Sequence, residues 1–155
     1  LQQCKDRAIH TAVDTCCCGP RKVLKAMVPL ADLFLCDIKH MDPDKHRAFT
    51  GVKNDAILDN IAYVARSQCP LIIRVPVIGG FNDTPGEIAS IVNFVKSLKT
   101  VHQIDLLPYN SGGVQKAERL GQPGLILDGS APEPAWMQEL ADMVRQNGFK
   151  VNIGG

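Results

Sequence analysis

The chain has 155 residues, 45% of them hydrophobic, so we predict that residues 1–155 form a single domain with a sizeable core. Seventeen Lys and Arg residues against sixteen Asp and Glu residues give a net charge of +1, and these charges are interspersed. This balance argues against a nucleic-acid partner and against a membrane-surface patch. No apolar run approaches the ~20 residues of a membrane span and no signal peptide opens the chain, so the expected location is the cytoplasm.

The first half of the chain alternates between helical and extended patterns. Residues 2–7 are predicted to start it as a short helix, followed by a strand over 8–15 that ends in a polar turn. Apolar residues then recur at helical spacing over 20–30. A near-continuous apolar run over 33–38 predicts a strand covered on both faces. A short helix is expected after Asp42, whose side chain can cap it.

The second half repeats this alternation. An amphipathic helix is predicted over residues 54–67, a strand over 71–77 and a third amphipathic helix over about 88–98. A further strand is expected over 104–110, and a last helix over 133–146 stops at an Asn-Gly pair. Between these two elements lies a long connection rich in Gly and Pro, and the FKVNI segment is a candidate final strand.

Strands that alternate with covering helices imply an α/β fold with a parallel sheet and right-handed crossovers. The choice is between a doubly wound open sheet and all or part of a (β/α) barrel. No G-x-G-x-x-G or G-x-x-x-x-G-K-[ST] motif follows any strand, which disfavours the nucleotide-binding open sheet without excluding it.

Each main strand releases polar residues into the loop that follows it, and ligands of parallel α/β folds bind at that edge. In strand order these residues are Asp14 and Thr15, Asp37 and Lys39, Arg74, then Tyr109 and Asn110. Period-two geometry places Asp37 and Lys39 on one face, and Arg74 in an apolar strand needs an anion. Together they predict a mixed-charge basin suited to a zwitterionic ligand. The alternative is structural, with Asp37 paired to Lys39 and Arg74 bridging a carboxylate.

Three of the six cysteines are consecutive, at Cys16, Cys17 and Cys18. Clustered cysteines in a long, core-rich chain are unlike a secreted disulfide scaffold, so reduced thiols are expected. Adjacent side chains diverge, and thiolate metal sites normally use spacers, so metal binding by the triplet is disfavoured. A thiol or zinc protein built on the triplet stays an alternative. His10 is expected in the core, and none of the four histidines has a spacing that argues for a metal.

Five segments, in the right order, resemble those of glycyl-radical-enzyme activating enzymes, the pyruvate formate-lyase activating enzyme family within the radical SAM superfamily. In chain order they are AIHTAVDT, ADLFLCDIKHMDPDKHRAFTGV, LIIRVPVIGGFND, IDLLPYN and GFKVNIGG. The resemblance implies a partial (β/α) barrel, here of about four main strands. It implies that S-adenosylmethionine and a 4Fe-4S cluster generate a radical that abstracts hydrogen from a glycyl radical enzyme, with flavodoxin or ferredoxin as electron donor.

By position, the resemblance assigns Asp14, Thr15, the Leu35 carbonyl and Asp37 to a monovalent-cation site. Asp37 and Lys39 resemble contacts to S-adenosylmethionine, and Arg74 resembles an anion-pairing arginine. Asn110 stands where the family usually has a histidine that contacts the adenosyl group, and an amide can still donate and accept hydrogen bonds.

The chain departs from the family at the cluster, because no CxxxCxxC motif occurs. Cys16 to Cys18 have another spacing and follow another strand, so we interpret the triplet as an enlarged turn beside the cofactor pocket that ligates nothing. The chain is therefore expected to be the carboxyl-terminal portion of a longer enzyme and to be inactive alone. A strand at its open edge would recruit partners, so a non-catalytic interaction module derived from a barrel half is the other alternative.

Overall fold

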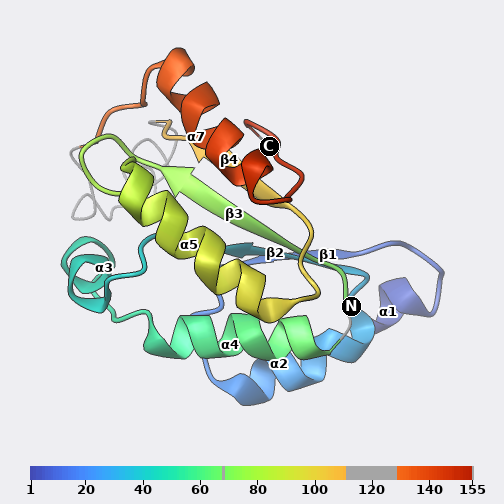
Figure 1. The fold of residues 1–155 in the computed structure, drawn as a ribbon. Coiled ribbons are helices and arrows are strands. Elements are labelled where there is room, and N and C mark those ends of the chain that lie inside the picture. The colour runs from blue at the N-terminus through green and yellow to red at the C-terminus, as the bar shows by residue number, and fades with distance from the viewer. Residues whose placement is uncertain (68, 111–128, 155) are drawn as a thin grey trace.

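The structure, a computed structural model, describes residues 1–67, 69–110 and 129–154. Within these residues it contains one sheet of four parallel strands in the order β1-β2-β3-β4 (Figure 1). The strands are β1 (Ala12–Thr15), β2 (Leu33–Asp37), β3 (Leu71–Val77) and β4 (Ile104–Pro108). Because all three strand pairings are parallel, the carboxyl ends of the four strands lie along one edge, as the predicted parallel α/β fold requires.

The helices lie between the strands and at the two ends of the described chain. They are α1 (Gln2–Lys5), α2 (Arg21–Met27), the 3₁₀ turn η1 (Val28–Leu30), α3 (Pro43–Thr50), α4 (Asp55–Arg66), α5 (Pro85–Leu98) and α7 (Pro134–Gln146). Asp42 caps α3 by accepting from the backbone N–H groups of Asp44 and Lys45 at 2.9 and 3.0 Å, as predicted. Thr84 caps α5 in the same way through the N–H of Glu87.

Among the described residues, the side chains on one face of the sheet are buried and those on the other face are only partly buried. In β2, Phe34 and Cys36 are completely buried while Leu35 and Asp37 are half-buried, and β3 alternates in the same way. The helices α2, α4, α5 and α7 pack in succession against one another along the covered face (Figure 1). The prediction that residues 33–38 are covered on both faces is therefore wrong for this chain, and the half-covered face carries Asp37.

The strand predicted over residues 8–15 is shorter than expected. Ala8 has a left-handed φ of 55°, and the N–H groups of Ala8 and Ile9 donate to the carbonyls of Lys5 and Cys4, which continues the turn after α1. Pairing with β2 starts only at Ala12. His10 consequently lies outside the strand and is exposed, so its predicted place in the core is wrong.

The carboxyl-terminal part follows the prediction closely. Helix α7 begins one residue later than expected and buries Met137 and Leu140, while Trp136 is half-buried and donates its indole N–H to the Asp83 carbonyl at 2.9 Å. The FKVNI segment makes two isolated parallel bridges to β4 and the residue before it, rather than a regular strand. The Gly-rich and Pro-rich connection lies mostly outside the described residues.

Across the described ranges, none of the helices combines the length and the apolar character that crossing a bilayer needs.

Candidate functional site

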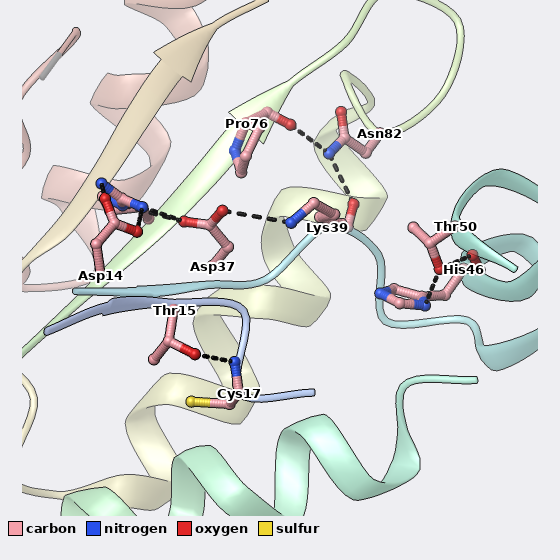
Figure 2. A network of polar contacts seen from close by, with 10 residues as sticks. Asp14, Thr15, Cys17, Asp37, Lys39, His46, Thr50, Pro76 and Asn82 are labelled. Atoms are coloured by element: carbon pink, nitrogen blue, oxygen red, sulfur yellow. Dashed lines mark hydrogen bonds and ion pairs between the residues drawn. The ribbon is translucent and has the colours of Figure 1, made fainter. Parts of the chain in front are cut away.

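Four charged side chains meet toward the carboxyl edge of the sheet, and we call Asp14, Asp37, Lys39 and Arg74 the charged rim. Figure 2 labels Asp14, Asp37 and Lys39. Asp14 comes from β1, Asp37 ends β2, and Arg74 lies in β3 directly opposite Asp37. Lys39 follows β2 by two residues and points back toward Asp37 (Figure 2). The predicted convergence of these four side chains is confirmed.

Arg74 joins the two carboxylates of the rim. Its Nε and Nη2 donate to Oδ1 of Asp37 at 3.0 and 2.8 Å, and its Nη1 donates to Oδ2 of Asp14 at 2.8 Å. Nη2 also donates to the second oxygen of Asp14. Burial alone would lower the pKa of the Arg74 guanidinium, but its hydrogen bonds and ion pairs with Asp14 and Asp37 hold the pKa above its ordinary value.

Lys39 completes the charge balance, because its Nζ lies 3.3 Å from Oδ2 of Asp37. Two carboxylates thus face one guanidinium and one ammonium. The side chains of Asp37 and Arg74 are 17% and 18% exposed, whereas those of Lys39 and Asp14 are 30% and 62% exposed. Lys39 and Asp14 are therefore the more accessible members of the rim, whereas Asp37 and Arg74 form its more buried pair.

Two buried asparagines fix the backbone that carries Lys39. Asn82, which is fully buried, donates from Nδ2 to the carbonyls of Lys39 at 2.7 Å and Pro76 at 2.8 Å (Figure 2). Its Oδ1 accepts from the N–H of Ile78 at 2.8 Å. Asn54 donates to the next two carbonyls of the segment, at 2.8 Å each. The loop after β3 is thereby tied to the loop after β2, which restrains the direction of the Lys39 side chain.

Sequence reasoning missed both asparagines. Asn82 stands in the GFND stretch of the loop after β3, and an amide side chain next to the apolar Phe81 in this loop was the available signal. Asn54 directly precedes α4, and the sequence pattern indicated only that a helix starts there.

His40 and His46 lie near the rim, and both are buried and hydrogen-bonded within the protein. His40 Nδ1 accepts from the N–H of Asp42 at 2.9 Å, and burial lowers the pKa of His40. His46 Nδ1 lies 2.9 Å from the Thr50 hydroxyl (Figure 2). It also lies 2.7 Å from the Val52 carbonyl. In the described part of the chain, no three His, Cys, Asp or Glu side chains gather into a group that could hold a metal ion.

The cysteine triplet forms a turn at the end of β1. Cys17 is buried with a left-handed φ of 57°, and its N–H donates to the Thr15 hydroxyl at 2.9 Å (Figure 2). Asn60 of α4 holds the turn by donating to the carbonyls of Cys17 and Gly19 at 2.9 and 3.0 Å. Cys16 and Cys18 are exposed. The buried Cys17 side chain is therefore separated from the exposed side chains of its two neighbours, as expected for adjacent residues.

The exposed thiols of the triplet border a cavity of about 290 Å³ next to the rim. Its lining includes Cys16, Cys18, Asp37 and Lys39 from the rim side and His46 from α3. The turn thus lies beside a pocket that the charged rim shares.

Asn110 follows β4 by two residues and is exposed. The parallel topology places it along the same edge as the rim. Its predicted contact with an adenosyl group stays a prediction, as do the roles assigned by resemblance to the rim residues and Thr15.

Comparison with known proteins adds the family. No protein-family model matches the sequence. The 4-hydroxyphenylacetate decarboxylase activating enzyme of Clostridioides difficile is 37% identical over 99% of this chain. The choline trimethylamine-lyase activating enzyme of Oleidesulfovibrio alaskensis is 33% identical, again over 99% of this chain. The chain spans about half the length of these relatives, 49% and 50% respectively.

A solved domain of a pyruvate-formate lyase-activating enzyme from Bacteroides vulgatus superposes with a TM-score of 0.81 at 30% identity, covering 99% of this chain and 86% of the domain. The chain belongs to the glycyl-radical-enzyme activating enzymes. Family membership confirms the resemblance read from the five sequence segments, and it identifies the four-stranded sheet of the described residues as part of a radical SAM barrel. In such a barrel the half-covered face of the sheet is the interior, and the charged rim opens onto it.

Proposed function

We propose that this chain is part of an enzyme that uses S-adenosylmethionine and a 4Fe-4S cluster to install a glycyl radical on a partner enzyme. Family membership supports the reaction type. The single observation that carries the role of this segment is the charged rim, which joins both charge signs at the ligand edge of the sheet. The proposed task of the 155 residues is to bind and orient the amino-acid part of S-adenosylmethionine.

The chemistry of the rim fits that ligand. S-adenosylmethionine carries a carboxylate and an ammonium on one carbon. Lys39 and Arg74 can pair with the carboxylate, while Asp37 can accept from the ammonium. In the unliganded arrangement these groups satisfy one another. Ligand binding then replaces internal ion pairs with equivalent ones, so that no charge has to be buried alone.

We further propose a monovalent-cation site formed by Asp14, the Thr15 hydroxyl, the Leu35 carbonyl and Asp37. All four are oxygen donors, and Asp14 lies opposite Leu35 in the strand register. Arg74 now joins the two carboxylates. Cation binding therefore requires the guanidinium to release Asp14, the more exposed of its two partners.

The cluster does not fit this chain. The sequence contains no CxxxCxxC motif, and the sulfur of Cys17 is buried while Cys16 and Cys18 are exposed. The cluster ligands must come from elsewhere in a longer enzyme, so no cluster step is assigned to these residues. The proposal also includes a glycyl radical enzyme as protein substrate and flavodoxin or ferredoxin as electron donor. It further includes a cytoplasmic location and a single domain over residues 1–155.

Two proteins test this function. One is the chain alone, and the other is a hybrid in which the chain replaces the matching segment of the Clostridioides difficile relative. After anaerobic treatment with iron and sulfide, and with a reductant present, we expect the hybrid to form 5′-deoxyadenosine from S-adenosylmethionine. We expect none from the chain alone. A correctly folded hybrid with a reducible cluster but no product, or turnover by the chain alone, would refute the proposed division of roles.

A further inference from the structure

Two buried thiols face each other behind the charged rim. The sulfur atoms of Cys17 and Cys36 lie 3.3 Å apart, and both side chains are buried. Cys36 belongs to β2 and points to the helix-covered face, opposite to its neighbour Asp37. The turn after β1 brings Cys17 to the same side. This sulfur contact has no part in the proposed binding of S-adenosylmethionine.

The distance is close to what a disulfide needs. Bonded sulfurs lie about 2.0 Å apart, so the pair has to close by roughly 1.3 Å. Cys36 is fixed in the middle of the sheet, whereas Cys17 lies in a turn outside the strands. The turn is held by hydrogen bonds to Thr15 and Asn60. We therefore expect Cys17 and its turn to move by this distance, because the side-chain hydrogen bonds of the turn can adjust. The pairing of the strands stays intact.

A small oxidant has a route to one of the two sulfurs. Cys17 lines a cavity of about 240 Å³ between the turn and α2, together with Thr15, Val23 and Leu24. A water molecule occupies about 30 Å³ in the liquid, so the cavity has room for a peroxide. Cys36 does not line this cavity. Oxidation therefore starts at Cys17, with Cys36 directly behind it as the second thiol.

We propose that Cys17 and Cys36 are a redox modification site that forms a reversible disulfide when hydrogen peroxide or a small alkyl peroxide enters this cavity. For hydrogen peroxide, the Cys17 sulfur takes one oxygen to become a sulfenic acid, and the first water leaves. The Cys36 sulfur then displaces the hydroxyl as a second water. Two S–H bonds and one O–O bond break, one S–S bond and two O–H bonds form, and the peroxide is reduced as both sulfurs are oxidised.

Disulfide formation reaches the proposed cation site through the turn after β1. The N–H of Cys17 donates to the Thr15 hydroxyl at 2.9 Å, and Cys36 directly precedes Asp37. Closing the sulfur pair shifts the turn that holds the Thr15 hydroxyl. An effect on ligand binding rests on the function proposed above, whereas formation of the disulfide does not, so the two can fail separately.

The test is peroxide treatment of the reduced chain, followed by alkylation of unpaired thiols and peptide mapping by mass spectrometry. We expect a product that has lost two hydrogens, carries one link between the triplet peptide and the Cys36 peptide, and returns to the reduced mass with dithiothreitol. The triplet cysteines share one peptide, so variants assign the bond. The double variant Cys16→Ser, Cys18→Ser should retain the link, and Cys17→Ser and Cys36→Ala should each lose it.

A link that persists in Cys17→Ser, or cross-links and over-oxidation confined to the exposed thiols, would overturn the proposal. Circular dichroism shows whether each variant is folded. Should Cys17→Ser or Cys36→Ala unfold, the double variant Cys16→Ser, Cys18→Ser, whose triplet peptide keeps only Cys17, is oxidised in buffer and in urea and decides the question. We expect the Cys17–Cys36 link to dominate in buffer and to lose its selectivity in urea. Equal selectivity in urea would mean that the fold does not direct the pairing.

Discussion

Arg74 and Asp37 lie directly opposite each other on neighbouring strands, and two guanidinium nitrogens donate to one oxygen of the carboxylate at 3.0 and 2.8 Å. The other carboxylate oxygen faces Lys39 at 3.3 Å. Asp37 is therefore the centre of the charged rim. The parallel register places Arg74 opposite Asp37, and the period-two geometry of the extended chain places Lys39 on the same side as Asp37.

Replacing Arg74 by Met should destabilise the fold, because it leaves Asp37 and Asp14 without the cation between them. Breaking a buried ion pair costs about 3–5 kcal/mol, and partial solvent access reduces this to about 1–3 kcal/mol here. Urea denaturation measures the change in unfolding free energy. The matched control is Arg145→Met, which removes the exposed pair with Asp142 and should cost less than about 1 kcal/mol. Equal losses of unfolding free energy in the two variants would show that the Arg74 ion pairs stabilise the fold no more than an exposed surface pair does.

Asn82→Ala should cost more than an ordinary polar substitution. It leaves the carbonyls of Lys39 and Pro76 and the N–H of Ile78 without their side-chain partner in a buried site. We expect a loss of about 2–4 kcal/mol in unfolding free energy, since each unsatisfied buried group costs about 1–3 kcal/mol and relaxation recovers part of it. The exposed Asn147, which donates to the Met143 carbonyl, is the control, and Asn147→Ala should stay within about 1 kcal/mol. An Asn82→Ala variant whose unfolding free energy is nearly unchanged would contradict the role of Asn82 in tying the loop after β3 to the loop after β2.

Stability should fall as the pH drops below about 6.5, because burial lowers the pKa of His40 from its ordinary 6.5. Between the folded and unfolded pKa values the unfolded chain binds more protons, so acid favours unfolding in that window. In His40→Asn the side-chain oxygen can still accept from the N–H of Asp42, but this proton uptake is gone. Urea denaturation over a pH series should show a shallower dependence of the unfolding free energy on pH for His40→Asn than for the wild-type chain. An unchanged slope in His40→Asn would assign the acid sensitivity to other groups.

The sequence patterns predicted the sheet and the rim because both follow from periodicity. Alternation within each strand placed Asp37 and Lys39 together, and parallel order brought Arg74 beside them. The strand over residues 8–15 was predicted too long because its first half has the same apolar-polar pattern as a strand. The left-handed Ala8 that continues the turn after α1 has no signal of its own, since Ala is rare in that region.

The contacts made by Asn82 and Cys17 could not be predicted from the periodicity of the sequence. Asn82 acts through the carbonyl of a residue 43 positions earlier, and Cys17 meets the sulfur of Cys36 from another strand. Such pairings depend on how loops fold back over the sheet. A single sequence shows which side chains are able to bond, and tertiary packing selects their partners.

The most direct test of the central claim is the affinity of the hybrid enzyme for S-adenosylmethionine after Lys39→Gln, measured by equilibrium binding under anaerobic conditions. Loss of one charge-assisted contact should weaken binding about tenfold or more. Lys53→Gln, which removes an exposed lysine paired with Asp44 outside the rim, should leave the affinity unchanged. Equal affinity of wild type, Lys39→Gln and Lys53→Gln would contradict the assignment of the charged rim to S-adenosylmethionine.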